Sequence, residues 1–274
     1  MKGLVTTNPV AVGDVVDFET EPDLQTAVIT HLHQRKNYII RKSINLSKQA
    51  QVIAANLDQA CLVVTLASPR TSLGFIDRFL VTAEAYAIPS ILIFNKLDLF
   101  SEEGKEILAE YMAVYEKIGY PCYAVSALNG DNLDTIKALL TNKTSLFSGH
   151  SGVGKSSLIN QILPGIELRT GVISDFSDSG KHTTTFAEMF ELPFGGKLID
   201  TPGIRELGVI DIEKEELGHF FPEMRQRLNT CKYHNCVHVN EPGCAVLLAL
   251  ENGEIEPSRY DSYMSIYLGN DSRG

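Results

Sequence analysis

The segment Gly149–Ser156 constrains the fold of this chain more than any other, because it reads G-x-x-x-x-G-K-S. A short apolar run at 144–148 precedes it, and apolar side chains at helical spacing follow it at 157–163. Strand, glycine-rich loop and helix form the context that a phosphate-binding loop requires. The glycines let backbone N–H groups surround phosphate, while Lys155 can reach the β- and γ-phosphates and Ser156 can ligate Mg²⁺. We expect the nucleotide to contact Gly149, His150, Ser151, Gly152, Val153, Gly154, Lys155, Ser156 and Ser157.

Bulk composition narrows the class of protein. The chain has 274 residues and a formal net charge of −10, which argues against non-specific binding to nucleic acid. No apolar run is long enough to cross a membrane, and residues 1–9 lack the hydrophobic core of a secretory signal. We therefore expect a cytoplasmic protein. The five cysteines are an odd number with three of them late in the chain, which favours a metal site over a disulfide framework.

The N-terminal region has the pattern of short strands. Candidate strands at 10–18, 25–33 and 38–40 carry apolar and β-branched residues around turn signals. This pattern predicts a small β-barrel or a part of one.

The same region has a local excess of basic residues. No acidic residue occurs between Asp23 and Asp58. This interval is either a surface that contacts the phosphate backbone of RNA or the solvated face of a strand pair. Its basic side chains are Arg35, Lys36, Arg41, Lys42 and Lys48, with His31 and His33 beside them.

From Ala60 onward, buried strands alternate with helices. Continuous apolar runs are typical of parallel strands that are covered on both faces. The alternation predicts right-handed βαβ units and a parallel, doubly wound α/β sheet. The candidate strands are 61–66, 90–94 and 121–125, and the candidate helices are 75–83, 102–118 and 133–140.

Two motifs after these strands indicate guanine recognition. Asn95, Lys96 and Asp98 belong to an N-K-x-D sequence. The Asp98 carboxylate can accept hydrogen bonds from N1–H and the 2-amino group of guanine, which adenine cannot offer. Backbone N–H groups at Ser126 and Ala127 can bind the guanine O6. Asn95 and Lys96 would hold the base and the neighbouring loop.

Further phosphate-site elements follow the phosphate loop. In the Gly- and Ser-rich stretch 170–185, Thr184 is the preferred Mg²⁺ ligand and γ-phosphate sensor, with Thr183 as the alternative. Asp200 and Gly203 form a D-x-x-G sequence after a strand, which suits a Mg²⁺-water ligand and a γ-phosphate N–H donor. The segments 188–192 and 197–199 have the pattern of a pair of strands.

The residue after Gly203 is Ile204, which cannot position water as a glutamine does. His182 is therefore the candidate that orients or activates water, or else a solvated loop residue. Lys155 and Thr184 complete the expected catalytic set.

The order of these motifs is unusual. The base-recognition motifs at 95–98 and 126–127 precede the phosphate motifs at 149–156 and 200–203. A circular permutation of a GTPase fold, with the old termini joined near 141–144, explains that order without changing the spatial sheet.

A cysteine-rich segment follows the D-x-x-G motif. Cys231, Cys236, His238 and Cys244 have the spacing C-x4-C-x-H-x5-C, which supplies four ligands for a tetrahedral structural Zn²⁺. His234 is the competing imidazole ligand. Residues 245–251 and 257–268 have helical patterns, so we expect a small, mostly helical metal-binding domain.

Taken together, the motifs NKLD, SAL, GHSGVGKSS, GKHTTT, DTPGI and the cysteine cluster resemble the small-ribosomal-subunit-dependent GTPase A family (RsgA, also called YjeQ). The resemblance extends from about 47 to 250. It implies an OB-type domain at 1–46, a circularly permuted GTPase domain at 47–209 and a zinc-binding domain at 210–274. The Pro-Val-x-Val-Gly-Asp turn begins here at Pro9, whereas the family's OB-fold usually has further strands before it, so we expect a shortened barrel.

The resemblance also implies a function. The family acts in late maturation of the small ribosomal subunit, contacts rRNA and uses GTP with Mg²⁺. We expect the same of this chain, acting as a monomer on the subunit. A GTP-gated RNA-binding scaffold with incidental hydrolysis is the alternative. Asp98 disfavours an ATP-using enzyme.

Overall fold

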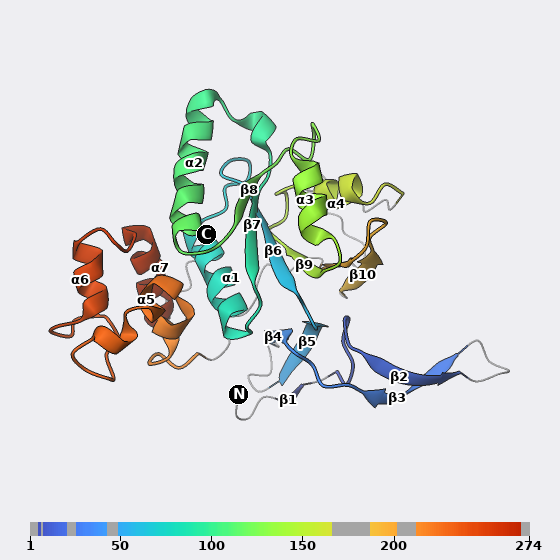
Figure 1. The fold of residues 1–274 in the computed structure, drawn as a ribbon, viewed down its shortest axis with the longest axis horizontal. Helices are drawn as coiled ribbons and strands as arrows, with labels where there is room; N and C mark the ends of the chain where they lie inside the picture. Colours follow the sequence, from blue (N-terminus) through green and yellow to red (C-terminus); the bar gives the residue numbers. More distant parts are fainter. Residues whose placement is uncertain are drawn as a thin grey trace, which may run out of the picture.

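The computed structural model describes residues 5–6, 8–20, 26–42, 49–165, 187–201 and 212–269. At its centre is a six-stranded sheet in the order β10-β11-β9-β6-β7-β8 (Figure 1). All neighbouring pairs are parallel except β10 and β11, which are antiparallel. The strands are β6 (Gln59–Val64), β7 (Ser90–Phe94), β8 (Cys122–Ala124), β9 (Thr144–Ser148), β10 (Glu188–Glu191) and β11 (Lys197–Asp200).

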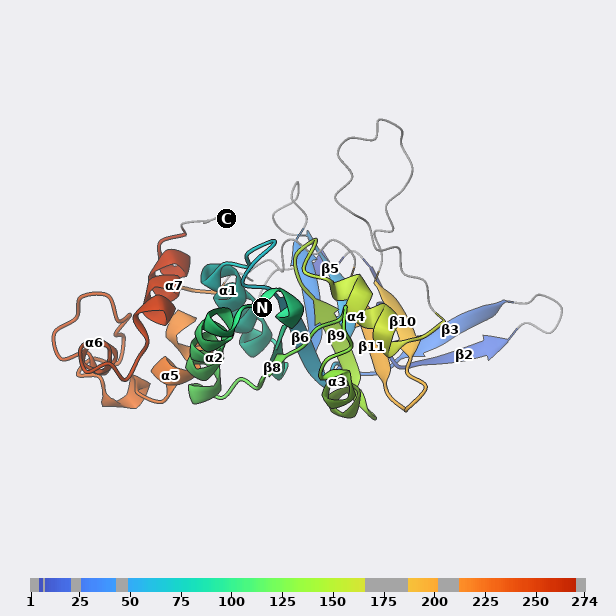
Figure 2. The same ribbon diagram turned by 90° about the horizontal axis from the view of Figure 1, so that it is seen from above.

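Helices cover both faces of this sheet (Figure 2). On β6, Leu62 and Val64 pack into a core with α1 and α2, while Cys61 and Val63 pack into a second core with α3 and α4. Burial on both faces explains why the central strands are continuously apolar. The helices are α1 (Leu73–Ala85), α2 (Glu102–Lys117), α3 (Leu133–Leu140) and α4 (Lys155–Ile162), with a 3-10 turn η1 (Leu97–Leu99) after β7.

The alternation of elements expected from the sequence is confirmed. The strands at 90–94 and 144–148 and the helix at 133–140 have the expected limits. Helix α2 begins at Glu102 as expected, because the Ser101 hydroxyl caps it by accepting a hydrogen bond from the Gly104 N–H. The expectation of a wholly parallel sheet is wrong. The sheet is mixed, because the edge strand β10 runs antiparallel to β11.

The N-terminal strands form two small sheets. One has the order β1-β5-β4, and the other is the two-stranded ribbon β2–β3, which projects away from the body (Figure 1). Within the described residues these strands do not close into a barrel. Strand β5 was not expected, and it pairs with both β1 and β4. The strands are β1 (Val5–Thr6), β2 (Val16–Thr20), β3 (Ala27–Leu32), β4 (Tyr38–Lys42) and β5 (Gln49–Ala55).

The C-terminal helices form a third core that packs on α1. Val81 of α1 belongs to this core together with Phe221, Val246 and Tyr263. The expected helices are present as α6 (Ala245–Glu251) and α7 (Pro257–Tyr267). The remaining elements are η2 (Leu217–Phe220), α5 (Pro222–Arg225) and η3 (Leu228–Thr230). Among the described helices, none has the length and apolar character needed to cross a membrane.

Candidate nucleotide and metal sites

Asn95 joins three of the sequence motifs. Its side chain is buried, its Nδ2 donates to the Val153 carbonyl at 2.8 Å, and its Oδ1 accepts from the Ala127 N–H at 3.0 Å. The phosphate loop, the N-K-x-D motif and the Ser-Ala motif therefore meet around one amide. Their strands β7, β8 and β9 are parallel, so their carboxyl ends lie at the same edge of the sheet.

A pocket opens beside this junction. It has a volume of about 560 Å³ and is lined by both Asp98 and Gly154. The Ser126 hydroxyl donates to Asp98 at 2.5 Å, so a hydroxyl holds one carboxylate oxygen at the pocket wall. An oriented carboxylate of this kind suits the paired donors of a guanine edge. The other lining residues are Asn95, Lys96, Leu99, Ala127, Leu128, Ser157, Asn160 and Gln161.

The phosphate loop has the geometry that its glycines permit. Gly154 has a φ of +86°, and a Cβ at that position would lie 2.4 Å from the Asn95 amide nitrogen. Only glycine fits there without strain. Gly154 is also the N-cap of α4, so the helix directs its first N–H groups toward the loop.

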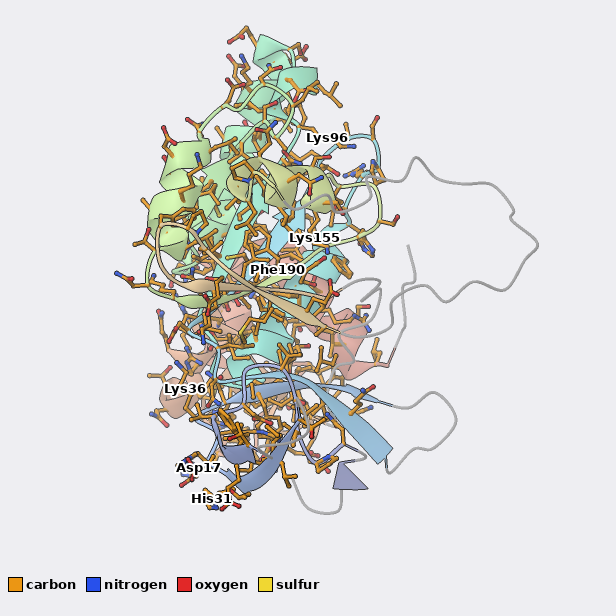
Figure 3. The ribbon with its side chains drawn as sticks, turned by 90° about the vertical axis from the view of Figure 1, so that its right-hand side faces the viewer. Asp17, His31, Lys36, Lys96, Lys155 and Phe190 are labelled. Atoms are coloured by element: carbon orange, nitrogen blue, oxygen red, sulfur yellow. The ribbon has the colours of Figure 1, made fainter. Side chains whose placement is uncertain are left out.

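Lys155 contacts Asp200 across the phosphate site. The Lys155 ammonium donates to the Asp200 carboxylate, and both side chains are largely buried. The expected phosphate-binding cation and the expected Mg²⁺-water ligand thus lie side by side. Figure 3 shows Lys96 and Lys155 above the β2–β3 ribbon, which carries Asp17 and His31.

Part of the expected catalytic machinery lies outside the described residues. This applies to His182, Thr183 and Thr184, and also to Gly203 and Ile204. Ser156 and Ser157 are present at the start of α4, which the expected roles in Mg²⁺ and phosphate binding require.

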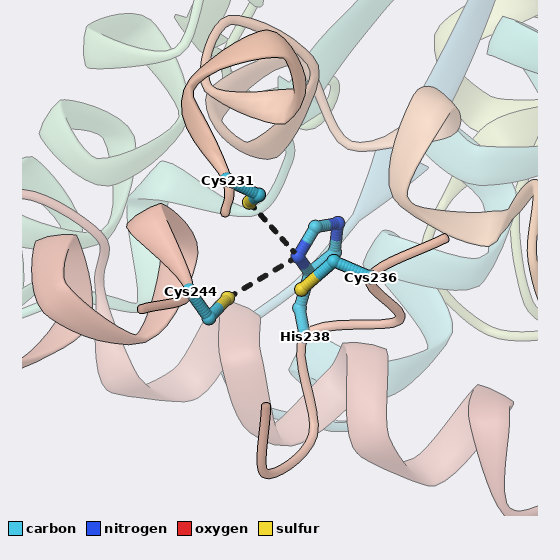
Figure 4. Close-up of side chains that lie close together, drawn as sticks. All are labelled: Cys231, Cys236, His238 and Cys244. Atoms are coloured by element: carbon cyan, nitrogen blue, oxygen red, sulfur yellow. Dashed lines mark hydrogen bonds between the residues drawn. The ribbon is translucent and has the colours of Figure 1, made fainter. Parts of the chain in front are cut away.

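Three cysteines and one histidine converge in the C-terminal region (Figure 4). One ligand atom from each of Cys231, Cys236, His238 and Cys244 lies within 4.8 Å of all the others. The His238 Nδ1 lies 3.3 Å from the Cys244 Sγ and 3.7 Å from the Cys231 Sγ. Three sulfurs and one imidazole nitrogen at these separations suit a four-coordinate Zn²⁺. His234 is not a member of this group.

The surroundings of His238 hold it in a ligating state. Burial lowers the pKa of the His238 imidazole, which favours the neutral form that binds metal. Tyr260 donates to the His238 carbonyl at 2.8 Å. A Cβ on Gly218 would lie only 3.1 Å from the His238 ring, so the chain approaches the imidazole closely.

Glu241 supports the same loop. Burial alone would raise the pKa of Glu241, but backbone N–H groups of Val237, Val239 and Asn240 donate to its carboxylate and hold the pKa below its usual range. The loop that carries His238 is therefore ordered by its own carboxylate.

Sequence comparison identifies the family to which these sites belong. Residues 32–210 match the sequence model described as RsgA GTPase. This match covers more than half of the chain. The chain belongs to the RsgA GTPase family.

Individual relatives agree with this assignment. A "Small ribosomal subunit biogenesis GTPase RsgA" of Flavobacterium psychrophilum is 50% identical over 275 residues, which cover 99% of this chain and 84% of the relative. A protein of the same name from Bacteroides fragilis is 52% identical over 266 residues, with coverage of 97% and 86%.

Two solved structures have the same fold. YjeQ from Thermotoga maritima superposes with a TM-score of 0.78 at 38% identity, covering 97% of this chain and 86% of the other. YloQ, described as a circularly permuted GTPase, superposes with a TM-score of 0.74 at 34% identity, with coverage of 100% and 85%. The circular permutation expected from the motif order is confirmed, and the chain is a GTPase of this RsgA type.

In this RsgA family member, carboxylates partly neutralise the basic side chains between Asp23 and Asp58. Arg35 forms a two-pronged pair with Asp14 at 2.6 and 2.7 Å, and Lys36 contacts Asp58 at 2.5 Å. Because Asp14 is buried, Arg35 has a structural role in holding the Ala11–Asp14 turn. The structure does not describe the side chains of Arg41, Lys42 and Lys48.

Sequence reasoning did not identify several residues that line the base pocket. Leu99 and Leu128 are exposed apolar side chains there, and Asn160 and Gln161 come from the second turn of α4. The signal for Leu128 was its position directly after Ser126 and Ala127. The signal for Asn160 was helical spacing from Ser156, one turn further along α4.

Proposed function

We propose that this chain hydrolyses GTP in the biogenesis of the small ribosomal subunit, bound to the subunit and in contact with its rRNA. The observation that supports the proposal is the pair of hydrogen bonds that Asn95 makes to Val153 and Ala127, beside a pocket lined by Asp98 and Gly154. The names of relatives with about half of their residues identical supply the process.

Within this proposal, the base and the phosphates bind at separate ends of the pocket. Asp98 accepts from the guanine N1–H and 2-amino group, and Lys96 lies beside the base. Ser126 and Ala127 face its O6. The phosphates are held by backbone N–H groups of 149–157 and by the Lys155 ammonium. Gly203 supplies an N–H group to the γ-phosphate.

Nucleotide entry changes the partners of Lys155. In the described structure its ammonium contacts Asp200. With nucleotide bound, Lys155 would turn to the β- and γ-phosphates and release the Asp200 carboxylate. Ser156, Thr184 and Asp200 would hold Mg²⁺, which would supply positive charge to the phosphates. His182 orients the attacking water, and Thr184 and Lys155 hold the γ-phosphate end of the site.

The C-terminal cluster holds one structural zinc ion in this proposal. Cys231, Cys236, His238 and Cys244 supply four ligands, which leaves no coordination position for substrate. The ion would link the loop 231–244 to α6, whose N-cap is Cys244 itself.

For the domain organisation we propose an N-terminal RNA-binding region, the permuted GTPase region and the zinc region. The limits expected from the sequence are 1–46, 47–209 and 210–274. Because β5 pairs with β1 and β4, we propose that the first region instead extends to Ala55. We further propose a cytoplasmic monomer, in keeping with action on ribosomal subunits.

The test is GTP turnover with and without purified small ribosomal subunits. We expect slow turnover alone and strong stimulation by subunits at low salt, falling as salt is raised because rRNA contacts are ionic. His182→Ala should lose the stimulated rate and keep GTP affinity, whereas His234→Ala, outside the metal cluster, should keep both. Equal turnover with and without subunits would overturn the proposal. Binding to subunits that depends on GTP, without stimulated turnover, would instead indicate a scaffold.

A further inference from the structure

The segment 65–75, which joins β6 to α1, belongs to none of the nucleotide motifs but has a defined structure. The Thr71 N–H donates to the Thr65 carbonyl at 2.8 Å, and the Thr65 N–H donates to the Thr71 hydroxyl at 3.2 Å. Both threonines are buried. Ser72 then caps α1 by accepting from the Phe75 N–H. The segment is therefore a closed loop fixed to the end of a helix.

This segment contacts the nucleotide site at three places. The Phe75 ring lies against the His150 ring of the phosphate loop, with centroids 3.7 Å apart and planes inclined by 33°. The Pro69 ring lies against Gly152, where a Cβ would come within 3.3 Å of the proline Cδ. The Lys96 ammonium donates to the Ser68 carbonyl. Two contacts are thus on the phosphate loop and one is on the guanine motif.

The contact of Phe75 with His150 joins two aromatic rings. Phe75 is carried by the capped first turn of α1, whose next residue, Ile76, is completely buried in the main core. The ring is therefore presented from a rigid support. His150, in contrast, is on a loop whose function depends on the directions of its backbone N–H groups.

We propose that Phe75 is a positioning residue for nucleotide binding, which stacks on His150 and holds the phosphate loop in its binding conformation before nucleotide arrives. A loop that is ordered in advance loses less conformational entropy when ligand binds, so affinity is higher. Pro69 supports the same loop at Gly152. This inference rests on the nucleotide site proposed above and adds a residue that no nucleotide motif contains.

A double-mutant cycle on the full-length protein tests the role of Phe75. The measurement is the affinity for a fluorescent GDP analogue, together with the melting temperature of the nucleotide-free protein. Phe75→Leu keeps apolar volume but removes the ring, and we expect it to weaken GDP binding roughly 3- to 10-fold, the range of a lost aromatic pair. His150→Ala should weaken binding to the same extent. The double variant should be no weaker than either single one, because both remove the same contact.

Two further variants separate positioning from general stability. Phe75→Tyr keeps the ring and should retain affinity. Phe194→Leu alters another half-buried phenylalanine, in the β10–β11 turn at the opposite end of β11 from Asp200, and should leave affinity unchanged. If Phe75→Leu fails to fold, the test uses His150→Ala and Phe75→Tyr instead. His150 is on a loop, so its substitution should not prevent folding.

The outcomes distinguish this inference from the proposed site itself. Lys155→Ala should abolish GDP binding. If Lys155→Ala binds GDP normally, the nucleotide site is wrong and the role of Phe75 falls with it. If Lys155→Ala loses binding while Phe75→Leu and His150→Ala do not, only the positioning role is wrong. Effects of the two single variants that multiply in the double variant would also overturn it, because the residues would then act independently.

Discussion

Arg259 of α7 donates a 2.6 Å hydrogen bond to Asp77 of α1, inside the contact between the C-terminal helices and α1. Its Nε also donates to Glu223 of α5 at 2.7 Å. All three side chains are buried. Burial raises the pKa of Asp77, and the Arg259 guanidinium opposes that rise. The Arg259 guanidinium therefore pairs with two buried carboxylates.

Removing this cation should strongly destabilise the protein. Arg259→Leu leaves the Asp77 and Glu223 carboxylates buried without their cation, which should lower the free energy of unfolding by about 3–5 kcal/mol. Denaturant unfolding followed by circular dichroism measures the change. The matched control is Arg225→Leu, which breaks a more exposed pair with Glu84 and should cost no more than about 1 kcal/mol. Equal losses of unfolding free energy in the two variants would contradict this prediction, because the buried pairs of Arg259 would then contribute no more than the exposed pair of Arg225.

Changing the base-site carboxylate should change the nucleotide preference. Asp98→Asn offers an N–H donor to the 2-oxo group of xanthine and loses an acceptor for guanine. We expect GDP affinity to fall at least roughly 100-fold and XDP affinity to rise. Titration with both nucleotides measures this. Asp131→Asn, at an exposed residue of the loop between β8 and α3, is the control. Unchanged GDP affinity in Asp98→Asn would remove the base-site assignment.

The cysteine cluster should bind zinc in a stoichiometric amount. We expect metal analysis of protein purified without chelator to find one zinc per chain, and Cys236→Ser to lose most of it. The same variant should increase hydrogen exchange from about residue 217 onward, because metal binding and folding of a small domain are coupled. Nucleotide binding should be retained. Cys122→Ser, at a buried cysteine of β8, should keep its zinc. Zinc-free wild-type protein would contradict the prediction.

The Asp14–Arg35 pair should make the N-terminal sheet sensitive to acid. Burial would raise the pKa of Asp14, but hydrogen bonds from Arg35 and the Ala11 N–H outweigh it and lower the pKa. A carboxyl whose pKa is lowered on folding stabilises the fold above its unfolded pKa, about 3.9, and that stability is lost as pH falls through the folded pKa.

Asp14→Asn tests this dependence. We expect faster hydrogen exchange in β4 and β5 at pH 7, corresponding to a loss of about 1.5–3 kcal/mol. The difference from wild type should shrink as the pH falls through the lowered folded pKa of Asp14, because the wild-type carboxyl is then protonated as well. Asp17→Asn, at an exposed carboxylate on the β2–β3 ribbon, should show little effect at either pH. A difference that persists in acid would mean that charge is not the cause.

Much of the central sheet was predictable because its signals are local. A strand covered on both faces must be apolar throughout, as Leu62 and Val63 are, and a helix start needs a cap such as Ser101. The N-terminal sheets were harder to predict. Strand β5 is polar at its start, and its parallel partner β1 lies far from it in the sequence. Pairing over such distances leaves no periodic signal in a single sequence.

The sequence by itself determined the motifs, their permuted order and the ligand set of the cysteine cluster, because each depends on residue type and spacing along the chain. Only the tertiary structure decided which groups meet. Asn95 faces Val153 and Ala127, Phe75 stacks on His150, and Arg259 lies between Asp77 and Glu223. These contacts join residues separated by up to 182 positions. Close packing and the need to pair buried charge select them, and neither requirement can be read from neighbours in the chain.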